Sequence, residues 1–154
     1  MLIRFAMHED IPKLIANWQQ YEQGRFGHIA FDEAKFVATI KSLVDAKGTH
    51  CLFVAEGEEQ SICGVLAGKI DYYYFSSQPI AQMVLYWVRP DHRASPVAVK
   101  LMMAFRNWAE NRKVAELVVG VTSGEAIDRT DRFLKKMGFQ LTGGNYAMPL
   151  AKPE

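Results

Sequence analysis

IAQMVLYWVRPDHRASPVAVKLMMAFRNWAE, residues 80–110, is the part of the chain that decides its fold. Its beginning, Ile80 to Val88, is almost continuously apolar, which predicts a central strand that is buried on both faces. Ser95 has a side chain suited to a helix N-cap, and Pro96 suits the first turn of the helix that follows. That helix has one apolar face, formed by Val97, Ala98, Leu101, Met102, Phe105 and Trp108. The stretch therefore predicts a buried strand, a short turn and an amphipathic helix.

Helical and strand patterns alternate before this stretch. A first strand is expected over Leu2–Ala6, followed by a helix capped by Asp10 and a second helix capped by Asp32. Two further strands, Cys51–Ala55 and Ile62–Ile70, are joined by an acidic turn that is typical of a hairpin.

The pattern continues after the stretch. A strand is expected over Leu117–Val121, a helix over Asp128–Met137 that Gly138 ends, and a final pair of short strands over Phe139–Leu150. The order β-α-α-β-β-β-α-β-α-β-β predicts a mixed α/β layer fold. No repeat or Pro/Gly/Ser-rich linker interrupts it, so a single domain over residues 1–154 is expected.

Composition narrows the class of protein. Hydrophobic residues make up 49% and charged residues 23% of the 154, which is ordinary for a globular domain and argues against global disorder. No apolar run approaches the roughly 20 residues that span a bilayer, and the first residues do not read as a signal peptide. A cytoplasmic protein without a membrane partner is expected. Cys51 and Cys63 lie in apolar runs and are expected to be buried free thiols, and no metal-ligand spacing is present.

The charges are distributed unevenly. Between Arg89 and Lys136 there are ten Lys and Arg against six Asp and Glu, a local excess of four, although the net charge is only +1. These basic residues are scattered among acidic neighbours and form no tract, so a nucleic-acid partner is not expected.

Two local motifs resemble those of the GNAT superfamily of N-acetyltransferases. The central motif of that family, loosely V-x-P-x-x-R/Q-x-x-G-x-G/A, is matched at Val88, Pro90, Arg93 and Ala98. The chain departs from it at Pro96, where glycine is usual. A later motif, Y-x-K-x-G-F, is kept at Lys136, Gly138 and Phe139, with Leu134 in place of the tyrosine.

The resemblance extends in element order from Leu2 to about Leu150. It implies the GNAT acyl-CoA N-acyltransferase fold, a central mixed, twisted sheet of six to seven strands with four helices. The segments Thr122-Ser123-Gly124, Asp131-Arg132-Phe133-Leu134 and Gly143-Gly144-Asn145-Tyr146 are similar in style to small GNAT proteins encoded by bacteriophages.

The resemblance also implies acetyl-CoA as cosubstrate. A helix start supplies unpaired amides and a positive dipole end for the pyrophosphate. Pro96 lacks the amide that glycine would offer, so the expectation is either weaker pyrophosphate binding or compensation by a side chain, Arg93 or Arg132. The expected cofactor-binding residues are Tyr86, Trp87, Val88, Arg93, Ala94, Ser95, Pro96, Val97, Ala98, Thr122, Arg132 and Phe133.

The catalytic groups are less clear, because this chain lacks two that many family members use. A carboxylate is common on the fourth strand, where this chain has Val84 and Leu85, and Leu134 replaces the helix tyrosine. Proton donors to the thiolate are then Ser123 and Tyr146, and the candidate bases are Glu125, Asp71 and His28. Catalysis largely by positioning is the alternative.

The expected function is transfer of an acetyl group to a primary amine of a small molecule or protein, by direct attack in a ternary complex. The alternative is a catalytically degenerate GNAT-fold module for binding or regulation. The aromatic run Tyr72–Phe75 and the loop 24–29 are expected to border the acceptor site. The resemblance makes a homodimer a reasonable expectation.

Overall fold

The computed structural model describes residues 1–21, 26–93, 95–121 and 127–150. Its main elements are β1 (Leu2–Phe5), α1 (Ile11–Tyr21), α2 (Glu33–Asp45), β2 (His50–Glu56), β3 (Ile62–Asp71), β4 (Ile80–Val88), α3 (Val97–Glu110), β5 (Leu117–Val118) and α4 (Ile127–Lys136). Short 3-10 turns cover His8–Asp10, Glu58–Gln60 and Pro90–His92. The mixed α/β class and the four helices are as predicted.

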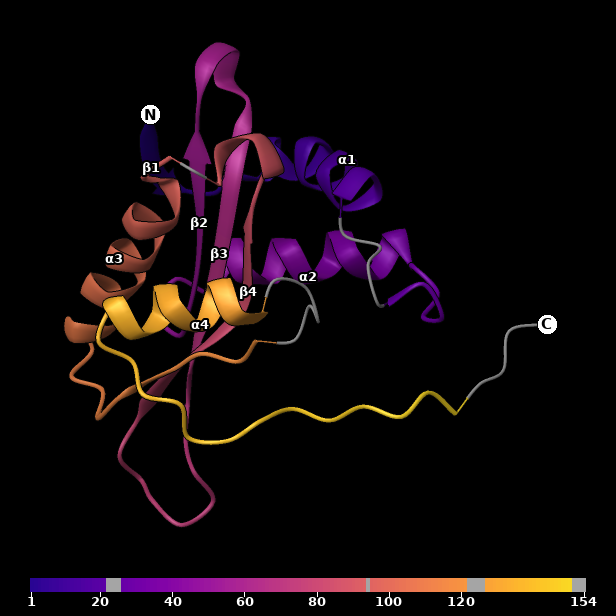
Figure 1. Ribbon diagram of the computed structural model, residues 1–154. Helices are drawn as coiled ribbons and strands as arrows, with labels where there is room; N and C mark the ends of the chain where they lie inside the picture. The colour runs from indigo at the N-terminus through magenta and orange to yellow at the C-terminus, as the bar shows by residue number, and fades with distance from the viewer. Residues whose placement is uncertain (22–25, 94, 122–126, 151–154) are drawn as a thin grey trace.

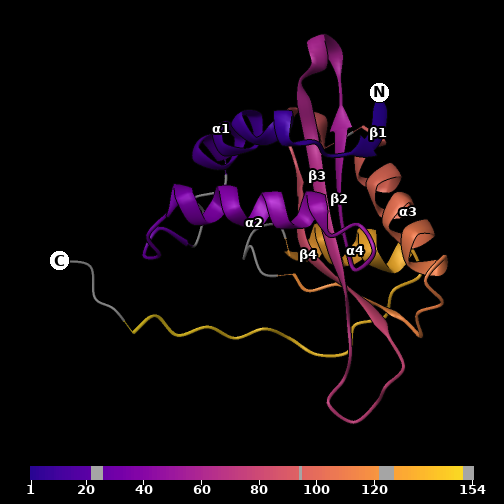
Figure 2. The same ribbon diagram turned by 180° about the vertical axis from the view of Figure 1, so that it is seen from behind.

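One mixed sheet carries the described strands in the order β1-β2-β3-β4-β5. The first four pair antiparallel with their neighbours, and β5 pairs parallel with β4. Helices α1 and α2 cover one face of the sheet, and α3 and α4 cover the other (Figures 1 and 2). The fold is therefore three-layered, and β4 lies next to the edge formed by β5.

Successive side chains of β2 belong alternately to the hydrophobic cores on the two sides of the sheet. Cys51 and Phe53 belong to the cluster packed by α3 and α4, whereas Leu52 and Val54 belong to the cluster packed by α1 and α2. Successive side chains of a strand point to opposite faces, so a strand covered by helices on both faces is apolar throughout. Both cysteines are buried and free.

Two glycines of β3 let α3 approach the sheet. A Cβ atom at Gly68 would overlap the Phe105 ring, and one at Gly64 would lie 2.9 Å from Leu101 Cδ1. Phe105 and Leu101 are fully buried on α3. The absence of side chains at these β3 positions therefore sets the distance between helix and sheet.

The C-terminal segment departs from the prediction. Phe139–Leu150 was expected to form two strands, but it is one extended segment without strand pairing, and the described residues form a sheet of five strands rather than six or seven. In both overall views it runs away from the layered body (Figures 1 and 2). Gly143, Gly144 and Pro149 weaken its strand character, since glycine offers no side chain to pack and proline no ladder amide.

Asp10 also differs from its predicted role as a helix cap. It ends a 3-10 turn, and its carboxylate accepts hydrogen bonds from the Met7 amide at 2.8 Å and from two Arg4 nitrogens at 2.8 and 2.9 Å. Arg4 additionally donates to Glu56 at 2.6 Å. The predicted cap at Asp32 is confirmed, because its side chain accepts from the Lys35 amide at 3.1 Å.

Within the described ranges, none of the helices has the length and apolar character needed to pass through a bilayer.

Candidate active site

The sheet opens between β4 and β5. Their parallel pairing is limited to Ala81 with Leu117 and Gln82 with Val118. From Met83 to Val88, β4 has no strand partner on that side among the described residues. We call this opening the wedge. The predicted strand over 117–121 is thus shortened to two residues, and no β5 strand lies beside the later part of β4.

A bulge in β4 sets which side chains face each layer. The register with β3 passes from Ala67–Leu85 to Gly68–Met83, which leaves Val84 as the extra residue. Val84 is 52% exposed, so the prediction that β4 is buried on both faces is wrong at its centre. After the bulge, Tyr86 faces the α3–α4 layer, and Trp87 faces the α1–α2 layer. Bulges of this kind often re-aim side chains beside active sites.

Tyr86 has a buried hydroxyl that finds no hydrogen-bond partner within the described residues. Its ring stacks on Phe133 of α4, with centroids 6.4 Å apart and planes 7° from parallel. Burial raises the pKa of the phenol, so it stays protonated and remains a donor. Leaving such a donor unpaired costs about 1–3 kcal/mol, which an amide or carbonyl of a ligand in the wedge would recover. The residues present therefore fit a pantetheine-like arm.

The turn after β4 is held by arginine side chains. Arg93 Nε donates to the Val88 carbonyl at 3.1 Å, which places the Arg93 guanidinium at the carboxyl end of β4. Arg89 makes two 2.7 Å hydrogen bonds with Asp91, and these lower the pKa of the Asp91 carboxyl. Because Arg89 is engaged in this way, Arg93 is the better placed of the two for an anionic ligand.

Helix α3 begins one residue later than predicted. Pro96 is its N-cap, and Ser95 lies outside the helix, where Ser95 Oγ donates to the His92 carbonyl at 2.5 Å. The Val97 amide donates weakly to Ser95 Oγ at 3.4 Å. Pro96 removes one donor from the turn but leaves the first-turn amides of α3 in place at the positive end of the helix dipole.

The structure gathers some of the predicted cofactor-binding residues and separates others. The predicted residues that lie around the carboxyl end of β4 and the start of α3 are Val88, Arg93, Ser95, Pro96, Val97 and Ala98. Two others, Tyr86 and Phe133, stack on each other. Trp87 points to the opposite face, and Arg132 is exposed on α4. Ala94, Thr122, Ser123 and Glu125 lie outside the described residues.

The candidate proton-transfer groups that the structure describes are not brought to the wedge. Tyr146 lies in the extended C-terminal segment and is 98% exposed. Asp71 lies at the far end of β3, where it pairs with Lys69 at 3.5 Å, and His28 is exposed. The aromatic run Tyr72–Phe75 forms the exposed β3–β4 loop, at the end of the sheet opposite Val88 (Figure 1). Its place beside the acceptor site stays a prediction.

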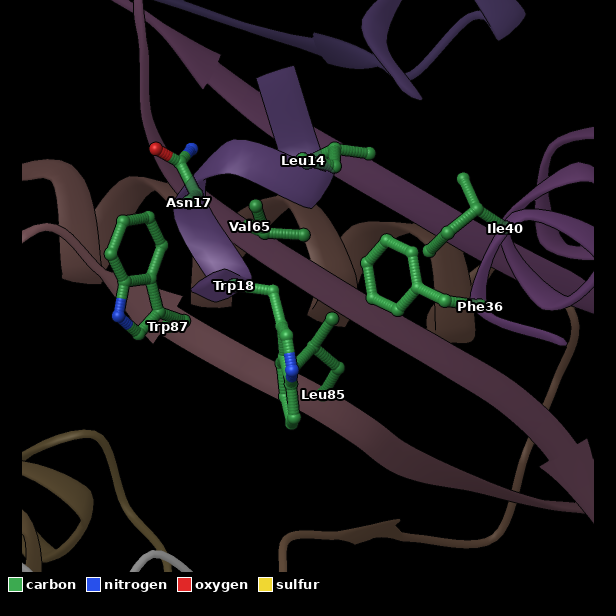
Figure 3. A pocket seen from close by; sticks show the side chains of 8 residues that line it. All are labelled: Leu14, Asn17, Trp18, Phe36, Ile40, Val65, Leu85 and Trp87. Carbon is green, nitrogen blue, oxygen red and sulfur yellow. The ribbon is translucent and has the colours of Figure 1, made fainter. Parts of the chain in front are cut away.

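A pocket in the α1–α2 layer was not predicted. It is a small, partly open space of about 30 Å³, and it is lined by Leu14, Asn17, Trp18, Phe36, Ile40, Val65, Leu85 and Trp87 (Figure 3). In the sequence, Trp18 and Phe36 read as members of two apolar helix stripes. Only the tertiary arrangement shows that these stripes leave a space above β4.

Comparison with known proteins assigns the family. The Acetyltransferase (GNAT) family matches residues 5–139 of the chain. The chain belongs to this family. It is thus an acetyl-CoA-dependent acetyltransferase, and acetyl-CoA is its cosubstrate, as the motifs around Val88 and Gly138 predicted.

Solved structures agree on the GNAT fold. An aminoglycoside 6'-N-acetyltransferase from Acinetobacter haemolyticus, AAC(6')-Ig, has a TM-score of 0.73 at 18% identity over 99% of this chain and 100% of that one. AAC(6')-Iy, in complex with a bisubstrate analogue of CoA and acetylneamine, has a TM-score of 0.72 at 17% identity over 99% of this chain and 97% of that one. A ribosomal-protein-alanine N-acetyltransferase from Brucella melitensis has a TM-score of 0.70 at 14% identity over 97% of this chain and 100% of that one. Such identities establish the fold and leave the acceptor open. No curated protein matches the chain.

Proposed function

We propose that the protein transfers the acetyl group of acetyl-CoA to a primary amine of a small molecule or a protein, by direct attack in a ternary complex. The observation that carries the proposal is the wedge, where β4 separates from β5 after Gln82 and leads through its turn into the start of α3. Bound there, acetyl-CoA supplies an activated thioester for attack by the amine.

Each part of the wedge has a distinct proposed role. The first-turn amides of α3 and the Arg93 guanidinium hold the pyrophosphate. The β4 edge of the wedge and the Tyr86 hydroxyl hold the pantetheine arm. A backbone amide near Val88 stabilises the oxyanion that forms as the amine attacks. These roles are supported by the geometry of the turn and by the unpartnered Tyr86 hydroxyl.

Positioning supplies most of the proposed rate enhancement. Val84 and Leu85 stand where a strand carboxylate is common in the family, and Leu134 packs against the α3–α4 core. Holding the two reactants in line can lower a barrier by several kcal/mol without a dedicated base, up to about 7–11 kcal/mol. Ser123 and Tyr146 stay candidate proton donors to the thiolate.

The first test is binding followed by turnover. Acetyl-CoA at about a hundredfold excess over its dissociation constant adds about 2.7 kcal/mol to the free energy of unfolding, so thermal melting should move upward. Release of free CoA in the presence of an amine then measures transfer. If acetyl-CoA leaves the melting temperature unchanged, the proposal is wrong.

A second candidate is a family member that binds acetyl-CoA without transferring the acetyl group. It is favoured by Pro96 in the central motif and by Leu134 in place of the tyrosine. Stabilisation by acetyl-CoA without release of CoA, across primary amines of several classes, would select it.

We propose further that residues 1–154 act as a single domain and assemble as a homodimer. The extended C-terminal segment supports the dimer, because its apolar side chains Leu141, Tyr146, Met148 and Leu150 are almost fully exposed. Tyr146, Met148 and Leu150 recur at every second residue, as on one face of a strand, and a second copy would cover them. Light scattering should give a dimer for the full chain and a monomer after removal of residues 140–154. A monomeric full chain would contradict this.

A cytoplasmic location is proposed as well. It is supported by the need for acetyl-CoA and by the free state of Cys51 and Cys63. Fractionation of cells that express the protein tests it.

A further inference from the structure

Tyr86 carries a buried hydrogen-bond donor on the side of the wedge that α3 and α4 cover. Its hydroxyl oxygen is buried and has no partner among the described residues. The ring lies parallel to that of Phe133 on α4, the helix that crosses this face of the sheet (Figure 1). The residue as a whole is only partly buried, so a small rotation of the ring can bring the hydroxyl to a molecule in the wedge.

The surroundings of this hydroxyl are apolar. Met83, Leu117 and Leu134 are among the partly buried residues packed on the same core as Tyr86. Burial raises the pKa of the Tyr86 phenol, and no charge on the described residues contributes to the shift. In such surroundings an unpaired donor is costly, and an unpaired negative charge is costlier still. A ligand atom that gains negative charge next to this donor would therefore relieve both costs.

The backbone of β4 places the reacting thioester near Tyr86. The Arg89 amide donates to the Cys63 carbonyl on β3 at 2.8 Å. Because the amides of successive strand residues point to opposite sides, the Val88 amide is directed away from β3, toward the wedge. In the proposed function this part of the backbone holds the acetyl oxygen. Tyr86 and Val88 share one face of the strand, about 6–7 Å apart, so a sulfur bonded to the same carbonyl carbon lies within the span of a tyrosine side chain.

We propose that the Tyr86 hydroxyl donates a hydrogen bond to the sulfur of acetyl-CoA and stabilises the thiolate as it leaves. The inference rests on the proposed function, because it assigns the leaving-group step at the same site. The amine nitrogen forms a bond to the carbonyl carbon, the C–S bond breaks, and its electron pair stays on sulfur. The nitrogen loses a proton to water, and the thiolate takes one from water as CoA departs. Tyr86 keeps its own proton throughout, since burial disfavours the phenolate.

Such a hydrogen bond acts mainly in the transition state. The sulfur of a thioester is a weak acceptor, whereas a thiolate is charged, and hydrogen bonds to charged acceptors are stronger. The bond therefore strengthens while the C–S bond breaks. An interaction that is stronger in the transition state than in the ground state raises the rate more than it tightens substrate binding.

Binding of CoA tests this contact without turnover. A thiol ionises at about pH 8.5, and desulfo-CoA, which lacks the sulfur, is the reference ligand. Isothermal titration gives the ratio of the two dissociation constants at about pH 7 and about pH 9.5, on either side of that value. From the lower to the higher pH, the preference for CoA should rise about 10-fold more in the wild type than in Tyr86→Phe, whose thiolate has lost its donor. The same rise in both proteins would overturn the inference.

Stability without ligand checks that the hydroxyl is unpaired. Tyr86→Phe keeps the ring that stacks on Phe133 and removes a buried donor without a partner, so its melting temperature should equal or exceed that of the wild type. The matched control is Tyr74→Phe, which removes a hydroxyl from a fully exposed ring and should leave the melting temperature and both dissociation constants unchanged. A lower melting temperature for Tyr86→Phe would mean that the hydroxyl has a partner within the protein, and the inference would then be wrong.

Turnover separates a role in the transition state from a role in binding. With a primary amine that the wild type acetylates, Tyr86→Phe should slow the single-turnover release of CoA about 10- to 100-fold, with a much smaller change in the dissociation constant of acetyl-CoA. An unchanged rate, or a loss confined to the affinity, would contradict the inference. Stabilisation by acetyl-CoA is measured in parallel. If it is present while the effects of Tyr86→Phe fail, the inference alone is wrong; if it is absent in the wild type, the proposed function fails too.

Discussion

At the scale of single residues, Arg93 links the fold of the turn to its proposed chemistry. Its Nε is fixed on the Val88 carbonyl, while its charge lies at the start of α3. Arg93→Ala should therefore weaken acetyl-CoA binding about 10-fold, which corresponds to about 1.4 kcal/mol, with little change in the free energy of unfolding. Isothermal titration measures the affinity. Arg106→Ala is the control, because Arg106 is exposed and forms its ion pair with Glu110 on the same helix.

Asp10 gives the structure a pH dependence. Hydrogen bonds from Arg4 hold the pKa of the Asp10 carboxyl below its usual range, and the residue is only 4% exposed. Because the folded pKa is the lower one, the ion pair contributes stability above the unfolded pKa of about 3.9, and this is lost as the pH falls through the folded value. Asp10→Asn should cost about 1.5–3 kcal/mol at pH 7 and flatten the fall in stability as the pH drops through the acid range. Urea unfolding at a series of acid pH values measures the free energy of unfolding of both proteins. Parallel curves of this free energy against pH for wild type and variant would contradict the prediction.

At the scale of elements, the close contact between α3 and β3 depends on Gly68. Gly68→Ala forces the Phe105 ring to move in a packed core and should destabilise the protein by about 1–3 kcal/mol. Gly48→Ala is the matched control, since a Cβ there meets nothing within 4 Å, and it should stay within about 0.5 kcal/mol of wild type. Thermal melting of both variants measures the difference in stability. Equal melting temperatures would show that the close contact between α3 and β3 does not depend on Gly68.

The elements also show what a sequence can and cannot predict. Strand β4 and helix α3 were predicted closely because their apolar patterns are long and agree with their neighbours. The bulge at Val84 was not, since it arises only from the register between β3 and β4. Asp10 was read as a cap because a cap and a buried ion-pair partner look alike in sequence. Phe139–Leu150 has strand-like alternation, but a strand also needs an edge to pair with.

At the scale of the whole molecule, the two helical layers lie against opposite faces of β4. The α3–α4 layer faces the side of β4 that carries Tyr86, and the α1–α2 layer holds the pocket on the side of Leu85 and Trp87. The strand between them is open along one edge. From sequence alone, the motif positions Val88, Arg93 and Ala98 predicted the site at the end of β4 and the start of α3. The pocket in the α1–α2 layer depends on the packing of two separate helices, so no single segment of the sequence could predict it.

The most direct measurement of the central claim is a crystal structure of the protein with acetyl-CoA. We expect the pyrophosphate against the first turn of α3 near Arg93, and the pantetheine arm along β4 from Met83 to Val88 within reach of the Tyr86 hydroxyl. Acetyl-CoA bound at another surface, or a wedge closed by protein so that β4 and β5 pair along their length, would contradict it.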